Sequence, residues 1–309
     1  MLPFEKIQRS FLERCDAPLR PYVPLPIADL IERCVVVVDK PRGPTSHQVA
    51  EWVKDMLHVS RAGQAGTLDP AVTGLLPVAT TKATKLLQVL LEAGKEYVCS
   101  MHVHGDVSDK QLYMVLEQFV GKIKQFPPVK SAVKRQWRYR RVYYLEVLER
   151  DGREILFKVG CQAGTYIRKL CHDIGMALGC GAHMAQLVRS KSGGYTWDER
   201  VTLQQLKDAY VYYEQGDEAP LRALLHPQES LVRHLPRVYV DDASVVRVRN
   251  GIQVKGEMLV KIHTDIQKEE TVALFSLDQQ LLGFGTALYA SKQMLTQQGM
   301  VIKLQRISA

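Results

Sequence analysis

A single carboxylate, Asp69, stands in a run of small and flexible residues, RAGQAGTLDPAVTG at 61–74. Small residues leave room for another backbone to approach closely, and a positioned carboxylate can act as a nucleophile or as a base. The same run also fits a plain turn, because Asp-Pro often opens turns and glycine permits tight backbone conformations. Taken alone, the stretch favours the turn, so a catalytic role for Asp69 needs support from the rest of the chain.

Positive charge is concentrated between Lys122 and Arg141, where eight cations occur with no acidic residue. These cations are Lys122, Lys124, Lys130, Lys134, Arg135, Arg138, Arg140 and Arg141. Trp137 and Tyr139 lie among them. Cations neutralise phosphates and aromatic rings stack on unpaired bases, so the stretch indicates nucleic-acid binding, with a solvated charged loop as the alternative. RNA is favoured over DNA because no helix-turn-helix or zinc-finger pattern is present.

The bulk composition is that of an ordinary globular protein with a cationic excess. The chain has 309 residues, a length that favours about two domains. Its residues are 46% hydrophobic and 24% charged, and the net charge of +8 favours an anionic partner. The six cysteines lack metal-site spacing, so reduced thiols are expected. Neither a signal peptide, a membrane-spanning run nor a phosphate-binding loop is recognisable, and the His102/His104 pair favours a structural role. We therefore expect no metal, no nucleotide cofactor and no membrane partner.

The elements that must position these residues mix strands and helices without regular alternation. The sequence predicts a strand at CVVVVD, capping boxes at 45–48 and 202–205, one helix from about Lys82 to a stop at Gly94, and a hairpin at Asp151-Gly152. KEYVCSMHV alternates as a strand, and GTYIRKLCHDIGMALG has the apolar spacing of a helix. This pattern predicts an α+β fold, a mixed, largely antiparallel sheet with flanking helices. Short apolar runs after Pro236 predict a small C-terminal β-barrel.

Several blocks in order resemble the TruB-type pseudouridine synthases. They are VVVVDKPRGPTSHQV, AGTLDPAVTGLLPVA, GKEYV, PPVKSAVKR and GTYIRKLCHDIG. Longer matches, such as QFPPVKSAVKRQWRYRRVYY and LGCGAHMAQLVRSKSG, resemble the archaeal and eukaryotic dyskerin branch of that family. The C-terminal segment ending GFGTALYASKQMLTQQGMVIKLQR is similar to a PUA domain, a small RNA-binding barrel. The resemblance implies a catalytic domain at 34–235, a PUA domain at 236–309 and an N-terminal extension at 1–33 that packs on the C-terminal domain.

The resemblance also implies roles for particular residues. Asp69 is expected to be the catalytic carboxylate, Arg168 the guanidinium that keeps it ionised, and Tyr97 the stacking ring whose hydroxyl serves proton transfer. Surface pairing of Arg168 and a core position for Tyr97 are the alternatives. Further substrate-binding residues are expected at Leu187, which lines the uracil pocket, and at Gln64, Lys40 and Thr67. Gln64 stands where the family usually has histidine.

The implied activity is isomerisation of uridine to pseudouridine, without a cofactor. In the dyskerin branch this occurs in rRNA, inside an H/ACA ribonucleoprotein with a guide RNA and small protein subunits. A stand-alone enzyme acting on the T-loop uridine of tRNA, and an RNA-binding assembly protein with a lapsed active site, are the alternatives. Expected RNA-binding residues are Lys130, Lys134, Arg135, Arg138, Arg140, Arg141, Arg247 and Arg249. Without basic tails the protein is expected in an archaeal-like cytoplasm, or in the nucleolus if it is eukaryotic.

Overall fold

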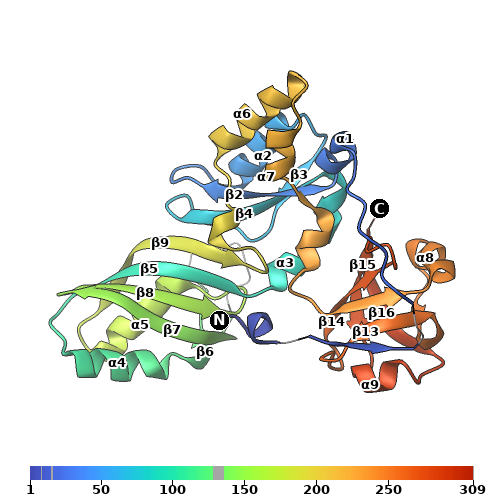
Figure 1. Cartoon of the computed structure of the whole chain (residues 1–309). Helices are drawn as coiled ribbons and strands as arrows, with labels where there is room; N and C mark the ends of the chain where they lie inside the picture. The colour runs from blue at the N-terminus through green and yellow to red at the C-terminus, as the bar shows by residue number, and fades with distance from the viewer. Residues whose placement is uncertain (8, 15–16, 128–135, 309) are drawn as a thin grey trace.

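The computed structural model describes residues 1–7, 9–14, 17–127 and 136–308. Within them the strands form two sheets, one of nine strands and one of seven. Figure 1 shows two lobes built on the larger sheet, and a third body, in orange and red, that holds the smaller one. The predicted α+β class, with a largely antiparallel sheet, flanking helices and a C-terminal β domain, is confirmed.

The first lobe of the large sheet is built around a strand whose first five residues are all apolar. Four of the five residues Cys34–Val38 are fully buried and Val38 is 1% exposed, because helices cover the sheet and leave no solvent-facing side there. Both predicted capping boxes are present, with Thr45 and Thr202 each accepting from the backbone three residues on. The elements are α1 (Ile27–Ile31), β2 (Cys34–Lys40), α2 (Ser46–Met56), β3 (Ala62–Gln64), β4 (Thr73–Thr80), η3 (Trp197–Glu199), α6 (Leu203–Glu214), α7 (Ala219–Leu224), β10 (His226–Pro227) and η4 (Gln228–Val232).

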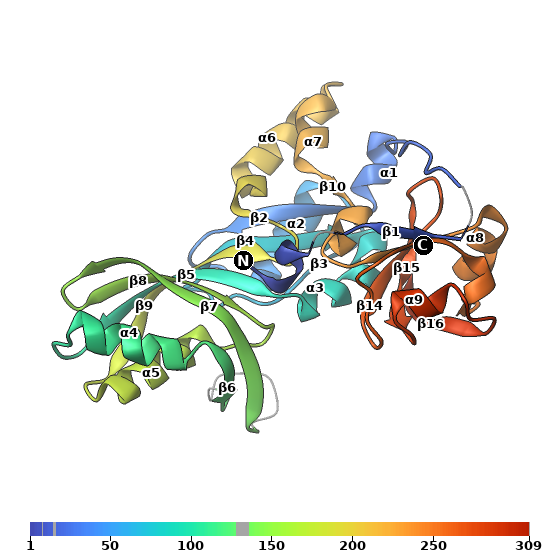
Figure 2. The ribbon, with the colours of Figure 1, turned by 60° about the horizontal axis from the view of Figure 1, so that its bottom comes forward.

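The second lobe is an antiparallel sheet with two helices packed against it (Figure 2). Its elements are β5 (Lys95–Val103), α4 (Asp109–Gln118), β6 (Gly121–Gln125), β7 (Arg138–Asp151), β8 (Glu154–Cys161), α5 (Ile167–Leu178) and β9 (Ala182–Ser192). The predicted hairpin joins β7 to β8, and Gly152 takes the positive φ of +55° that this turn requires. Cys99, Met101 and Val103 share the buried face of β5, as their alternation predicts.

The two lobes are joined through one short parallel pairing. The sheet order is β10-β2-β4-β9-β5-β8-β7-β6, and β4 meets β9 only at Thr73–Val188 and Gly74–Arg189. Gly74 lies there at φ +101°, and a Cβ on it would stand 2.4 Å from the Arg189 carbonyl oxygen, so only glycine fits. The loop that carries Asp69 leads directly into this junction.

The segment between the lobes departs from prediction. A single helix from Lys82 to Gly94 is expected, but the chain forms a 3₁₀-helix, η2 (Thr81–Leu86), and then a short α-helix, α3 (Gln88–Glu92). The Thr84 hydroxyl donates to the Thr81 carbonyl, a local bond that competes with α-helical pairing. Leu86 and Leu90 pack with Tyr239, Phe275 and Phe284 of the third body in one apolar core, so tertiary packing overrides the longer helix.

The third body is the seven-stranded sheet of order β1-β13-β11-β14-β15-β16-β12. Its elements are β11 (Arg237–Val240), α8 (Asp242–Arg249), β12 (Val254–Lys255), η5 (Gly256–Met258), β13 (Leu259–His263), β14 (Thr271–Phe275), β15 (Leu281–Ala287), α9 (Ser291–Met294) and β16 (Met300–Ile307). The N-terminal segment supplies an edge strand, β1 (Phe11–Glu13), which pairs antiparallel with β13.

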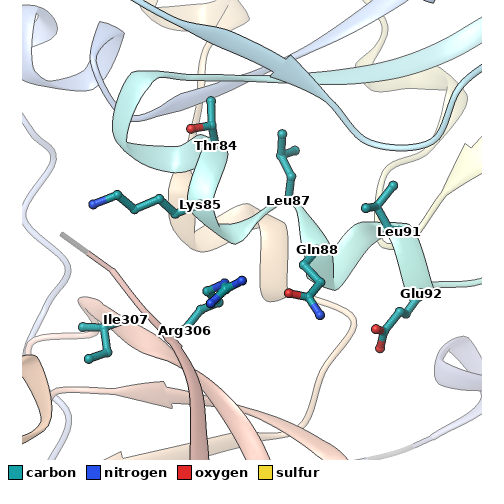
Figure 3. Close-up of a pocket in the computed structure, with 8 residues that line it drawn as sticks. All are labelled: Thr84, Lys85, Leu87, Gln88, Leu91, Glu92, Arg306 and Ile307. Atoms are coloured by element: carbon teal, nitrogen blue, oxygen red, sulfur yellow. The ribbon is translucent and has the colours of Figure 1, made fainter. Parts of the chain in front are cut away.

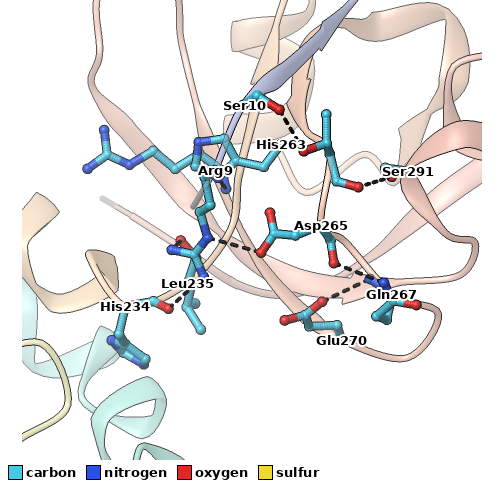
Figure 4. A network of polar contacts seen from close by, with 11 residues as sticks. Arg9, Ser10, His234, Leu235, His263, Asp265, Gln267, Glu270 and Ser291 are labelled. Carbon is cyan, nitrogen blue, oxygen red and sulfur yellow. Dashed lines mark hydrogen bonds and ion pairs between the residues drawn. The ribbon is translucent and has the colours of Figure 1, made fainter. Parts of the chain in front are cut away.

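The N-terminal segment reaches both sheets. Its first turn, η1 (Pro3–Lys6), lies against the second lobe, where Glu5 accepts from Lys191 at 2.7 Å. Arg9 then donates to the Asp265 carboxylate at 3.1 Å and to the carbonyl oxygens of His234 and Leu235 at 3.2 Å each (Figure 4). A single arginine therefore links the N-terminal segment, the connection between the domains and the C-terminal sheet.

Candidate active site

The Asp69 loop is held by backbone hydrogen bonds and presents its carboxylate outward. Val72 N donates to the Asp69 carbonyl at 2.9 Å, and Gly43 N donates to the Pro70 carbonyl at 2.8 Å. The buried Ser46 hydroxyl bonds both the N–H and the carbonyl of Leu68, at 2.8 and 3.0 Å. The Asp69 side chain is 60% exposed, so it is accessible to a nucleotide extruded from its stack.

Arg168 comes from the opposite lobe and meets Asp69. It is the second residue of α5, whose first turn faces the loop, and its Nη2 donates to Asp69 Oδ2 at 2.8 Å. A guanidinium at this distance stabilises the ionised carboxylate without burying it. Residues 99 positions apart in sequence are thus brought together at the junction of the lobes.

Tyr97 and Leu187 lie on the paired strands β5 and β9 of the second lobe. Tyr97 is at the start of β5, partly buried and directly opposite Arg189 of β9, and Leu187 pairs with Cys99. Burial raises the pKa of the Tyr97 hydroxyl, and the positive charge of Arg189 partly opposes that rise. Both side chains pack on the edge of the core of the second lobe, which fixes a ring and an aliphatic side chain beside one another.

Lys40, a predicted substrate-binding residue, contacts the Asp69 loop from the inside in this structure. Lys40 is fully buried, and its ammonium donates to the carbonyl oxygens of Pro41 at 2.9 Å, Pro70 at 3.3 Å and Val72 at 2.9 Å. Two of these carbonyls belong to the Asp69 loop, so Lys40 braces the loop from within. Its position at the end of a buried strand does not reveal on which side of the sheet the ammonium lies.

Gln64 and Thr67 are located on the rim of the same loop. Gln64 Nε2 donates to Thr67 Oγ1 at 3.1 Å, and Thr67 is exposed. The Gln64 Oε1 is buried and has no hydrogen-bond partner among the residues described. The chain therefore places at this position an acceptor that needs a donor.

Two buried cations of the site are missing from the sequence-based prediction. Arg189 is 1% exposed and donates to the carbonyl oxygens of Leu75 at 2.7 Å and Gly66 at 2.9 Å. Lys95 is 5% exposed and donates to the carbonyl oxygens of Leu90, Leu91 and Ala93 at 2.7, 3.0 and 2.8 Å. The only sequence signal for Arg189 is its spacing of two from Leu187, which puts both on one face of a strand.

The predicted RNA-binding residues divide into two separate regions. Lys130, Lys134 and Arg135 fall outside the described residues. Arg138, Arg140 and Arg141 lie at the start of β7, where Arg141 N donates to Gln162 Oε1 shortly before α5 begins, whereas Arg247 and Arg249 lie exposed on α8 of the C-terminal body (Figure 1). Trp137 and Tyr139 are 60% and 57% exposed, but Lys124 and Lys122 lie over their rings at 4.7 and 4.3 Å.

Other parts of the molecule lie away from this site. A cavity of about 760 Å³ separates η2 and α3 from the end of β16, and it is lined by Lys85, Gln88 and Arg306 among others (Figure 3). His183 joins His102 and His104 at ring-centroid distances of 5.1–5.9 Å, yet the described residues hold no group of three or more side chains placed to bind a metal. In the part of the chain that the structure describes, every helix is too short or too polar to cross a membrane.

Comparison with known proteins identifies the family. Residues 54–111 and 104–167 match the TruB family pseudouridylate synthase N-terminal domain, 168–233 match the tRNA pseudouridylate synthase B C-terminal domain, and 236–308 match the PUA domain. A probable tRNA pseudouridine synthase B of Methanopyrus kandleri is 48% identical over 284 residues, 91% of this chain and 84% of that protein.

Solved structures agree over the whole chain. The crystal structure of a Cbf5-Nop10-Gar1 complex contains a chain with TM-score 0.94 and 41% identity, covering 100% of this chain and 96% of that one. A structure of an H/ACA RNP bound to a substrate RNA containing 2′-deoxyuridine gives TM-score 0.91 and 40% identity, with 100% and 97% covered. The chain therefore belongs to the TruB family of pseudouridine synthases and carries a PUA domain at its C-terminus.

Proposed function

We propose that this protein isomerises uridine to pseudouridine in rRNA as the catalytic subunit of an H/ACA guide ribonucleoprotein. The observation that carries the chemistry is the Asp69–Arg168 contact of 2.8 Å at the junction of the lobes, beside Tyr97 and Leu187. The guided form is supported by the match across the whole chain to proteins solved in H/ACA complexes.

The geometry supports a division of labour between these side chains. In the reaction the C1′–N1 bond breaks, a C1′–C5 bond forms, the C5 proton leaves and N1 gains a proton. Asp69 is the group that starts it, either by attack on the base or by action at the sugar, and Arg168 keeps it ionised and oriented. Tyr97 stacks on the uracil and its hydroxyl serves the C5 proton transfer, while Leu187 fills the pocket wall.

RNA contacts outside the site are part of the same proposal. Arg138, Arg140 and Arg141 on β7 would meet phosphates near the target, and Arg247 and Arg249 on α8 would meet RNA at the PUA domain. We place the complex in the cytoplasm, on the ground that the relatives named above include one from an archaeon. The partners proposed are a guide RNA, a target RNA and small proteins like those in the solved complexes.

A stand-alone tRNA enzyme is the second candidate, because curated relatives at up to 50% identity are named as probable tRNA pseudouridine synthase B. Isomerisation would be assayed on tRNA alone and on a guide-matched target with reconstituted partner proteins. We expect guide-dependent activity in the wild type and a loss of about 10³-fold or more in Asp69→Asn, which keeps the size of the side chain.

Each other outcome has its own meaning. Activity confined to bare tRNA would establish the second candidate. An inactive wild type that binds RNA tightly would indicate an assembly protein with a lapsed site. Full activity of Asp69→Asn would contradict the assignment of the carboxylate.

A further inference from the structure

Arg189 is a buried guanidinium that pairs with no carboxylate among the described residues. It is 1% exposed, and it donates hydrogen bonds to two backbone carbonyls, to Leu75 through Nε and to Gly66 through Nη1. The second terminal nitrogen, Nη2, is buried and lacks a hydrogen-bond partner among the described residues. Burying a charge is costly unless it is fully bonded, so a fold that keeps this arginine half-satisfied has a use for its remaining donors.

Arg189 lies directly across the strand pair from Tyr97. The two residues oppose each other in the β5–β9 register, next to an irregularity at Glu96/Tyr97. They also act on each other electrostatically: Arg189 lowers the pKa of the Tyr97 hydroxyl against the effect of burial, and Tyr97 opposes the fall that burial causes in the pKa of Arg189. The buried guanidinium is therefore adjacent to the phenol on one side.

On its other side Arg189 supports the catalytic loop. Gly66 lies three residues before Asp69 at φ +85°, and a Cβ there would stand 3.4 Å from Arg189 Nη1 and 3.7 Å from Lys95 Cε. Lys40 and Lys95 are also buried nearby, and Arg189 adds to the effect of burial in lowering the pKa of both lysines. Holding a third cation in this cluster works against stability, which argues against a purely structural role.

We propose that Arg189 is a positioning residue that links the two halves of the active site: it holds the Asp69 loop through the Gly66 carbonyl and directs its remaining N–H donors to the Tyr97 hydroxyl. Arg189 thereby fixes the positions of the Asp69 loop and of the Tyr97 ring relative to each other and to the target uracil. A lysine, with one nitrogen, cannot bridge both positions, whereas the planar fork of arginine can. The inference rests on the proposed roles of Asp69 and Tyr97.

The test is a double-mutant cycle in the reconstituted complex. Arg189→Met and Arg189→Lys are each made once with the wild-type Tyr97 and once together with Tyr97→Phe. The single-turnover rate and the Kd for RNA are measured for each variant. We expect Arg189→Met to lower the rate about 10- to 100-fold while the Kd changes less than about threefold, with Arg189→Lys intermediate. In the Tyr97→Phe background the loss should shrink to about threefold or less, since the hydroxyl it acts on is gone.

The same fold loss in both backgrounds, or a Kd that rises in proportion to the loss of rate, would overturn the proposal. Arg153→Met is the matched control, because Arg153 is 48% exposed and pairs with Asp106 on the surface. If Arg189→Met fails to fold, Arg189→Lys decides by the same criterion. A wild type that is inactive on every substrate would contradict the proposed function. An active wild type with the same loss in both Tyr97 backgrounds would contradict only the role of Arg189.

A second readout needs no turnover. The ionisable groups that act on Tyr97 are Arg189 on β9 and Cys161 on β8. With 3-fluorotyrosine at position 97, the ¹⁹F signal reports the pKa of the phenol, and we expect Arg189→Met or Arg189→Lys to change it. Arg189→Met should raise this pKa by about one unit, because a neighbouring cation is removed, and Arg153→Met should leave it in place. An unmoved pKa in both Arg189 variants would contradict the proposal.

Discussion

The active site places its charges in two contrasting layers. On the surface, Asp69 and Arg168 are 60% and 54% exposed and pair with each other across the lobes. Underneath, Lys40, Lys95 and Arg189 are at most 5% exposed and bond backbone carbonyls. The difference separates two tasks: exposed charges can meet a substrate, whereas buried charges hold in place the backbone and side chains around them.

The two layers also differ in energetic cost. An exposed ion pair is screened by water and contributes little to folding, so mutating it should change catalysis more than stability. A buried cation loses its hydration and is tolerated only where several acceptors replace the lost water. Three carbonyls around each buried lysine do this, and removing such a lysine should therefore affect stability first.

The largest expected effect is on catalysis in the exposed layer. We expect Arg168→Gln to lower kcat/KM about 10²- to 10³-fold, because Asp69 loses the cation that orients it, while the free energy of unfolding changes by about 0.5 kcal/mol or less. Isomerisation kinetics and urea unfolding would measure the two quantities. Arg153→Gln, on the exposed pair with Asp106, should leave both unchanged. A large loss of stability in Arg168→Gln would break the distinction between the layers.

In the buried layer the expected effect is on stability. Lys40→Met removes the donor shared by Pro41, Pro70 and Val72, so we expect the free energy of unfolding to fall by about 3 kcal/mol, with loss of order in the Asp69 loop. Urea unfolding and amide exchange of residues 69–74 would report this. Lys54→Met on α2 is the matched control, since Lys54 forms a surface ion pair with Glu51 and its removal should leave the free energy of unfolding nearly unchanged. Equal effects of the two variants would show that Lys40 does not brace the loop.

The sequence predicts the exposed residues of the active site better than the buried ones. Asp69, Arg168 and Tyr97 stand in motifs with family-specific spacing, and the structure brings Asp69 against Arg168. The burial of Lys40 is not predicted, because a strand-end lysine is usually exposed and only the three-dimensional path of the Asp69 loop places carbonyls around it. Arg189 is overlooked because it reads as one more cation of a basic chain. Burial and backbone partners depend on pairing between distant strands, which local sequence does not encode.

The fold shows a similar limit. Capping boxes, the Gly152 turn and the alternation of β5 are local patterns, and each is confirmed. The helix predicted from Lys82 is broken because Leu86 and Leu90 pack against Phe284 of the C-terminal sheet. Contacts between separate domains thus decide where local propensity gives way.

Two buried histidines make the stability of the fold depend on pH. Burial lowers the pKa of His234 and of His263 to about 4, and His263 Nδ1 accepts from Arg237 N at 2.9 Å, a bond that only the neutral ring makes. Between pH 6.5 and 4 the unfolded chain binds protons that the folded chain does not, so this contribution is present above pH 6.5 and is lost as the pH falls toward 4.

We therefore expect stability to fall on the order of 2 kcal/mol per buried histidine between pH 7 and 4.5, and the loss to be smaller in His234→Gln. Thermal unfolding across this range would measure it. His172→Gln is the control for the same substitution at an exposed position, because the His172 side chain is 59% exposed. Identical profiles for the wild type and His234→Gln would assign the acid sensitivity to other groups.

The smallest effect is expected at Trp137, an exposed aromatic residue directly before β7. Trp137 is 60% exposed, and a base stacked on such a ring is worth about 1–3 kcal/mol. Lys124 already lies 4.7 Å from the ring centroid and Phe126 is 5.2 Å away, so one face is occupied and the gain from a stacked base is reduced. We expect Trp137→Ala to weaken RNA binding by about 1 kcal/mol, roughly fivefold in Kd, with an unchanged slope of log Kd against log salt. Lys124→Gln should instead reduce that slope, because it removes a cation that can neutralise a phosphate. Trp52→Ala on α2, 41% exposed, is the control that should bind like the wild type, and a Trp137→Ala variant indistinguishable from it would restrict RNA contact in this region to the cations.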